Sequence, residues 1–111
     1  MIEKIVLDYL SSELSVPVYM EIPDSPPEKF VIVEKTGSGR NERINNAIIA
    51  IQSYAGTMYE AAALNETVKT AMDSIAELDS VCKSSLNSDY NFTDTASKKY
   101  RYQAVFDLVF Y

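Results

Sequence analysis

Apolar positions between residues 44 and 78 follow two different periods, which predict a strand joined directly to a helix. In INNAIIAIQSYA, residues 44–55, apolar side chains fall on both faces of a period-two alternation, as is typical of a strand inside a sheet. Thr57 and Glu60 have the spacing of a capping box, so a helix should begin at Thr57. Apolar residues then recur at three- and four-residue steps: Leu64, Val68, Ala71, Met72, Ile75 and Leu78. We expect this strand and helix to form the centre of the fold.

The N-terminal residues predict an amphipathic helix followed by a short strand. Apolar residues from Ile2 to Leu14 have helical spacing, and Pro17 should end the helix near Ser15 because proline lacks the amide that a helix uses. Residues 16–22, VPVYMEI, predict a short strand, and the proline near its start favours a sheet edge. The prolines of PDSPPE, residues 23–28, predict a stiff extended loop.

The remaining segments predict three further strands and two connections. Residues 30–36, FVIVEKT, are rich in β-branched side chains and predict a strand. GSGRNER, residues 37–43, has two glycines and no apolar side chain, so we expect a mobile hairpin loop that projects into solvent. Residues 81–91 predict a weaker strand and residues 92–97 a polar turn. The last strand alternates most clearly, and one face should meet the helices: Tyr100, Tyr102, Ala104, Phe106, Leu108 and Phe110.

Taken in order, these elements predict an α+β fold in a single domain, residues 1–111. The expected order is α-β-β-β-α-β-β, with a mainly antiparallel five-stranded sheet and two helices packed on one face. A chain of 111 residues can bury one core, but an extended surface is hard to bury in so small a domain. Association with other copies would help to cover it.

Charge and hydropathy narrow the classes of partner. The chain has 16 acidic and 10 basic residues and a formal net charge of -6, without the basic patch that reads phosphates, so generic nucleic-acid binding is disfavoured. No apolar run approaches the ~20 residues of a membrane helix. The start MIEKIVLDYL lacks the basic, continuously apolar pattern of a signal peptide. The single cysteine, Cys82, fits a reducing compartment, so we expect the protein to stay in the cytoplasm where it is made.

Catalytic and metal-binding residues are not apparent in the sequence. The chain has no histidine, the commonest general acid or base at neutral pH, and its carboxylates are scattered. One cysteine without histidine cannot form a thiolate or imidazole metal site. Asn87, Asp89 and Asn91 have the spacing of a calcium loop, but Phe92 stands where such a loop requires glycine. We therefore predict no enzyme activity, no cofactor and no metal.

Tyrosine is the one residue type that points to an interface. Eight tyrosines are many for this length, and tyrosine is enriched where proteins meet because it covers apolar area with a polar tip. We take Tyr19, Tyr54, Tyr90 and Tyr111 as candidate contacts between subunits. Ordinary packing at half-exposed sheet positions would explain any one of them equally well.

Four segments, in this order, carry a resemblance to a known family. They are VPVYMEIPDSPPEKFVIVEKTG, then NNAIIAIQSYAGT followed by YEAA, then SLNSDYNFTD, and finally RYQAVFDLVFY. Their order and spacing resemble the small tail completion proteins of long-tailed bacteriophages, also called tail terminator or head-tail joining proteins. The similarity runs over most of the chain.

The resemblance implies a structural, non-enzymatic role in the virion. Members of this family assemble as rings, typically hexamers, that sit on the end of the tail tube, stop its polymerisation and offer a docking surface to the head connector. It implies as partners further copies of the chain, the tail tube protein and a head completion or connector protein, with assembly in the bacterial host cytoplasm. DNA would pass through the acidic bore without specific binding, since like charges repel. No membrane is implied.

Two hypotheses and one alternative follow. Arg40, Asn41, Glu42 and Arg43, on the projecting loop, should contact a neighbouring subunit, the tube or the connector. Sheet edges should pair between subunits to close a ring, because unpaired edges invite strand addition. The alternative is a small α+β ligand-binding or regulatory module, since one fold hosts many functions, and it predicts a concave pocket with convergent polar groups.

Overall fold

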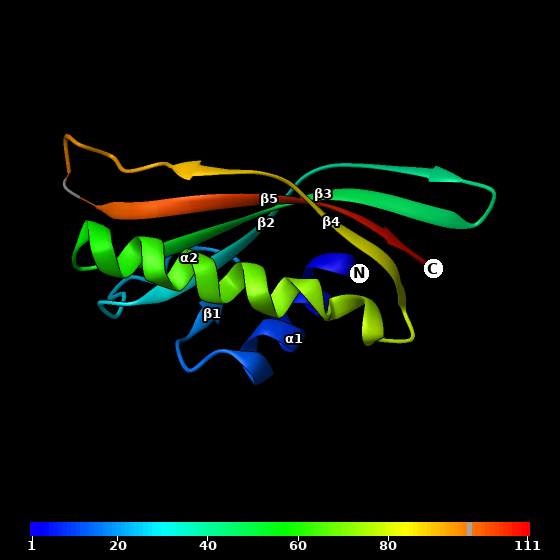
Figure 1. Ribbon diagram of the computed structural model, residues 1–111, viewed down its shortest axis with the longest axis horizontal. Helices are drawn as coiled ribbons and strands as arrows, with labels where there is room; N and C mark the ends of the chain where they lie inside the picture. Colours follow the sequence, from blue (N-terminus) through cyan, green and yellow to red (C-terminus); the bar gives the residue numbers. More distant parts are fainter. Residues whose placement is uncertain (98) are drawn as a thin grey trace.

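A five-stranded sheet carries two helices on one face in the computed structural model, which describes residues 1–97 and 99–111 (Figure 1). The element order α-β-β-β-α-β-β and the α+β class confirm the prediction. A 3-10 helix, η1, follows the second helix. The elements are α1 (Ile2–Glu13), β1 (Val18–Tyr19), β2 (Phe30–Asn41), β3 (Ile44–Ala55), α2 (Met58–Asp73), η1 (Ile75–Glu77), β4 (Val81–Asn91) and β5 (Tyr100–Phe110).

The strand order across the sheet is β1-β2-β3-β5-β4, which places β3 in the middle as its two apolar faces predict. Strand β1 pairs in parallel with β2, and the other neighbours are antiparallel, so the sheet is mixed but mainly antiparallel. Strand β1 lies at an edge, as predicted, but it spans two residues instead of residues 16–22. Only Val18 and Tyr19 find partners in β2, and the proline-rich residues that follow leave the ladder because proline cannot donate to it.

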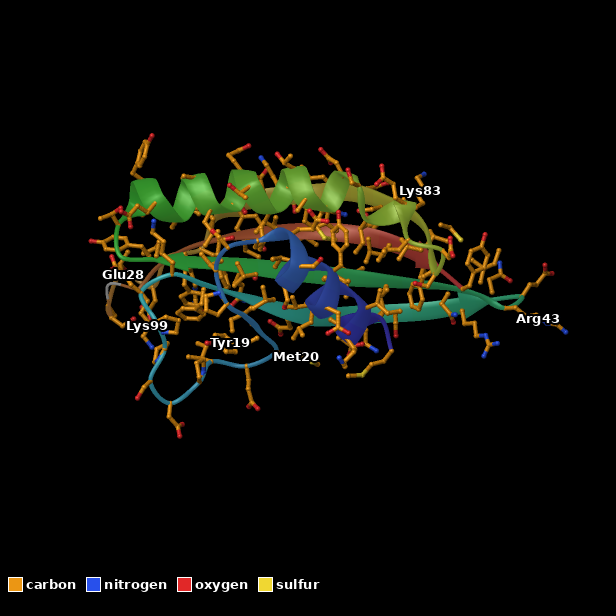
Figure 2. All side chains as sticks on the ribbon, turned by 90° about the horizontal axis from the view of Figure 1, so that it is seen from below. Tyr19, Met20, Glu28, Arg43, Lys83 and Lys99 are labelled. Carbon is orange, nitrogen blue, oxygen red and sulfur yellow. The ribbon has the colours of Figure 1, made fainter. Side chains whose placement is uncertain are left out.

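Residues 37–43 do not form the expected long loop. Gly37 to Asn41 continue β2 and pair with Ile48 to Ile44 of β3, leaving only Glu42 and Arg43 as the turn. Backbone pairing with the neighbouring strand therefore overrides the polar, glycine-containing composition. The hairpin still extends beyond the helices, and Figure 2 shows Arg43 at its far end.

Helix α2 begins where the capping box predicts. The Thr57 side chain accepts a hydrogen bond from the Glu60 amide at 3.1 Å. The helix ends at Asp73, earlier than the apolar periodicity suggests, because the Ser74 amide bonds back to Ala71 and the chain tightens into η1. Ile75 stays buried in η1, so the apolar stripe continues although the α-helix does not.

The core lies between the sheet and both helices. Strand β5 contributes the middle of its predicted face, whereas Tyr100, Tyr102 and Phe110 are half-buried. No helix in the described parts of the chain is long and apolar enough to span a membrane. The largest fully buried side chains of this core are Leu10, Ile49, Ile51, Met72, Ile75, Phe106 and Leu108.

Replacing the Thr57 cap should lower the free energy of unfolding. Thr57→Ala removes the acceptor for the Glu60 amide, and loss of such a cap costs about 1 kcal/mol. Thr67→Ala is the matched control, because Thr67 is exposed within α2 and its hydroxyl only bonds back to Ala63. Urea unfolding of both variants checks this, and equal midpoints would contradict a capping role.

Candidate interaction surfaces

The tip of the β2–β3 hairpin brings together the four predicted contact residues Arg40, Asn41, Glu42 and Arg43, all exposed. Its two turn residues have positive φ, 50° at Glu42 and 73° at Arg43. A two-residue hairpin with positive φ at both positions is a type I′ turn, which favours Asn-Gly or Asp-Gly. Left-handed backbone costs about 1 kcal/mol or more for a residue with a Cβ. The tip therefore holds two charged side chains in a backbone that disfavours them.

The tip is locally cationic on an acidic chain. Arg40 and Arg43 make no ion pair within the described residues, whereas Lys4, Lys35 and Lys69 are each paired with a carboxylate. Two arginines against Glu42 give the tip a net positive charge, although the chain as a whole carries -6. Such a tip is suited to contact an acidic surface, since unpaired exposed charges attract a complementary partner.

The four candidate tyrosines occupy different environments. Tyr90 is exposed on β4, and Tyr111 is 71% exposed after β5, so both side chains can reach a partner. Tyr19 is half-buried with its ring edge-on to Phe30. Tyr54 is 4% exposed and stacked on Phe30 at 4.5 Å between ring centroids, so little of its ring is open to a partner, and its role as a contact stays a prediction. A tyrosine alternates into either face of a strand, and only the register shows that Tyr54 lies opposite Phe30.

Tyr59 is an exposed tyrosine that the sequence interpretation missed. It lies in the first turn of α2 and is 83% exposed. Its position off the apolar stripe of the helix was a usable signal, because side chains on that side of an amphipathic helix face solvent.

A continuous chain of hydrogen bonds crosses the sheet face that the helices leave open. Arg101 donates to the Tyr54 hydroxyl at 2.8 Å, and that hydroxyl donates to Gln52 at 3.2 Å. Gln52 donates to Gln103 at 2.9 Å, and Gln103 donates to the Tyr90 hydroxyl at 2.6 Å. Both glutamines are only 9% exposed. We call these five residues the open-face chain.

Arg101 anchors one end of the open-face chain. Its guanidinium lies over the Phe92 ring at 4.5 Å and donates to the Phe92 carbonyl at 2.6 Å. Its distance to the Tyr54 ring centroid is 5.6 Å. Stacking and hydrogen bonding together hold the planar guanidinium in one orientation. The sequence did not reveal this set, because only the strand register places Gln52 directly opposite Gln103.

An apolar pocket of about 240 Å³ lies at the end of the sheet away from the hairpin tip. Phe30 and Tyr54 form its floor together with side chains of the proline-rich loop, and Glu28 and Lys99 add charge (Figure 2). The Glu28 carboxylate lies so close to Gly56 that a Cβ there would collide with it. The remaining lining residues are Ile22, Pro26, Ala55 and Tyr100.

Asp89, the central residue of the calcium-like spacing, is engaged by neighbouring side chains. Its carboxylate accepts hydrogen bonds from Asn65 and Lys69, each at 3.0 Å. Hydrogen bonds to Glu66 and Asp89 raise the pKa of the Lys69 ammonium, which therefore stays charged. Across the described residues, His, Cys, Asp and Glu side chains form no group suited to hold a metal ion.

Strand β4 is an edge strand with features that blunt strand addition. In the described part of the sheet its only strand neighbour is β5. The β4–β5 register shifts between Val81 and Lys83 and again between Leu86 and Ser88, and Lys83 is exposed. Bulges and edge lysines discourage another strand from pairing. Pairing of sheet edges between subunits remains a prediction, and this edge disfavours it.

Comparison with known protein families and with curated proteins gives no match to a family model and none to a curated sequence.

Replacing both glutamines of the open-face chain should cost less unfolding free energy than the sum of the two single replacements. Gln103→Leu leaves the buried Gln52 amide without its acceptor, which costs about 1–3 kcal/mol of unfolding free energy. Gln52→Leu/Gln103→Leu removes both groups, so its cost should be well below the sum of the two single costs. Urea unfolding of the three variants measures the coupling, and additive costs would contradict a shared chain.

Replacing the turn by its preferred residues should stabilise the hairpin. Glu42→Asn/Arg43→Gly relieves the left-handed backbone at both positions, and we expect a gain of about 1 kcal/mol. The matched control is Glu34→Asn. Glu34 is exposed on β2, the strand that leads into the turn, but lies away from the turn itself. Thermal unfolding followed by circular dichroism tests this. No gain would mean that the turn is not strained in solution.

Proposed function

We propose that this chain is a structural phage protein that assembles as a ring on the end of the tail tube and joins the tail to the head connector. The resemblance of its four segments to tail completion proteins motivates the proposal. The observation that carries it is the projecting β2–β3 hairpin with charged residues retained in its strained turn. Residues in a disfavoured backbone conformation at an exposed position are a reason to look for function there, because such strain clusters at functional sites.

The charge of the chain suits a ring through which DNA moves. A net charge of -6 over 111 residues disfavours adhesion to the phosphate backbone, since like charges repel. The basic tip is a local exception, so the proposal places it on a protein partner outside the bore. The expected partners are further copies of the chain, the tail tube protein and a head completion or connector protein.

One candidate site for the ligand-binding alternative is the apolar pocket beside Phe30 and Tyr54. Its volume of about 240 Å³ is below the roughly 300–1,000 Å³ usual for small-molecule sites. Its charged lining residues are Glu28 and Lys99, from different segments. The pocket is better suited to receive a protein side chain than to enclose a metabolite.

The tip can be tested in a phage or prophage that encodes this chain. The variant Arg40→Ser/Glu42→Asn/Arg43→Gly keeps the hairpin and removes its charges, so the protein should fold. We expect virion yield to fall at least about tenfold, with unjoined heads and tails in electron micrographs.

Lys83→Ser is the matched control, because it removes an exposed charge from β4 without touching the hairpin. It should leave the virion yield unchanged. Normal joining of heads to tails by the tip variant would refute the proposed role of the tip.

A further inference from the structure

We propose that the hairpin tip of one copy docks into the apolar pocket at the opposite end of a second copy. This inference rests on the proposed self-association and names the two surfaces that meet. In it, Ile44 supplies the apolar group that enters the pocket, and Arg43 faces Glu28 at the rim.

The tip offers both kinds of contact that such a site requires. Ile44 follows the turn and is 46% exposed, which leaves a large apolar side chain in solvent beside two arginines. Neither Arg40 nor Arg43 forms an ion pair in residues 1–97 or 99–111. Glu42 and Arg43 occupy a turn whose backbone conformation favours Asn-Gly, so the stability of the turn does not account for these two residues.

The end of the molecule that holds the pocket offers an apolar site beside acidic side chains, which complements the tip. Its lining is mostly apolar, with the stacked rings of Phe30 and Tyr54 already fixed in place. The loop over it, residues 20–28, contains Glu21, Asp24 and Glu28 and no basic residue. Glu28 lines the pocket, and where the chain is described its carboxylate has no ion-pair partner. A partly buried apolar contact surrounded by opposite charges is the usual anatomy of a protein interface.

Two lysines lie near the acidic loop, and only one of them lines the pocket. Lys99 also lines the pocket and reduces its negative charge. Lys29, next to Glu28 in the chain, instead lies 3.8 Å from the Glu60 carboxylate. The loop itself carries three carboxylates and no basic residue, so the loop, with Glu28 at the pocket, is the acidic surface that would meet the tip.

The two surfaces lie at opposite ends of the molecule. Figure 2 shows Arg43 at one end and Glu28 and Lys99 at the other, along a molecule of 44 × 25 × 25 Å. A contact between unlike ends is heterologous, so each copy keeps one free tip and one free pocket for the next. Repetition closes a ring when the rotation between copies allows it. The bulged β4 edge makes strand addition the weaker route to the same assembly.

Charge reversal in solution tests the contact with the full chain. Sedimentation velocity over a range of protein concentrations measures self-association of the wild type, Arg43→Glu, Glu28→Arg and the double variant. We expect each single variant to weaken association at least about tenfold and the double variant to restore most of it. Lys83→Glu makes the same charge change at an exposed β4 lysine that lies apart from Arg43 and far from Glu28, and it should have no effect (Figure 2).

The possible outcomes are distinct. A wild-type chain that stays monomeric at high concentration, or single variants that associate as the wild type does, would overturn the inference. So would loss without restoration in the double variant, provided that circular dichroism shows all variants folded. If restoration fails while the tip variant still blocks head-tail joining, the tip contacts a different tail protein and only the docking inference falls. If restoration succeeds but joining is normal, the docking stands and the phage role falls.

Discussion

The pairing of β3 along its whole length, with β2 on one side and β5 on the other, is the constraint on which the rest of the structure depends. Because β3 is buried on both faces, both must be covered. Helices α1 and α2 cover one face with apolar side chains. In the parts of the chain that the structure describes, no helix covers the other face, and neighbouring side chains bury Gln52 and Gln103 instead. Two amides buried in this way are tolerated only when they are hydrogen-bonded, and the open-face chain supplies those partners.

Local patterns in the sequence were sufficient for most of the fold. The capping box fixed the start of α2, and period-two alternation gave β3, β4 and β5 within a residue at either end. The errors occurred where pairing is decided by a distant strand. Gly37 to Asn41 look like a loop but are held as a strand by Ile44 to Ile48, and most of residues 16–22 look like a strand but lack a partner. Periodicity cannot detect either effect.

The candidate surfaces were predicted less completely, for related reasons. The projection of residues 40–43 follows from their polarity, but the left-handed turn does not, because Glu42-Arg43 carries none of the usual turn signal. Tyr54 and Arg101 are brought together by the alignment of β3 with β5. The pocket depends on how the proline-rich loop folds back over Phe30, which no local pattern specifies.

The far half of the hairpin is difficult to explain by folding alone. The first four residues of β2 are buried, whereas Gly37 to Asn41 bury no side chain fully. A two-stranded ribbon is marginal in water, so this half must take its rigidity from elsewhere. Strand β5 supplies this rigidity. Its pairing with β3 reaches Asn45, which lies opposite Phe110 and is the second residue of β3. Because β5 pairs with most of this part of β3, the tip is carried by three strands and not by a free two-stranded ribbon. Positioning of this kind matters for a contact with another molecule.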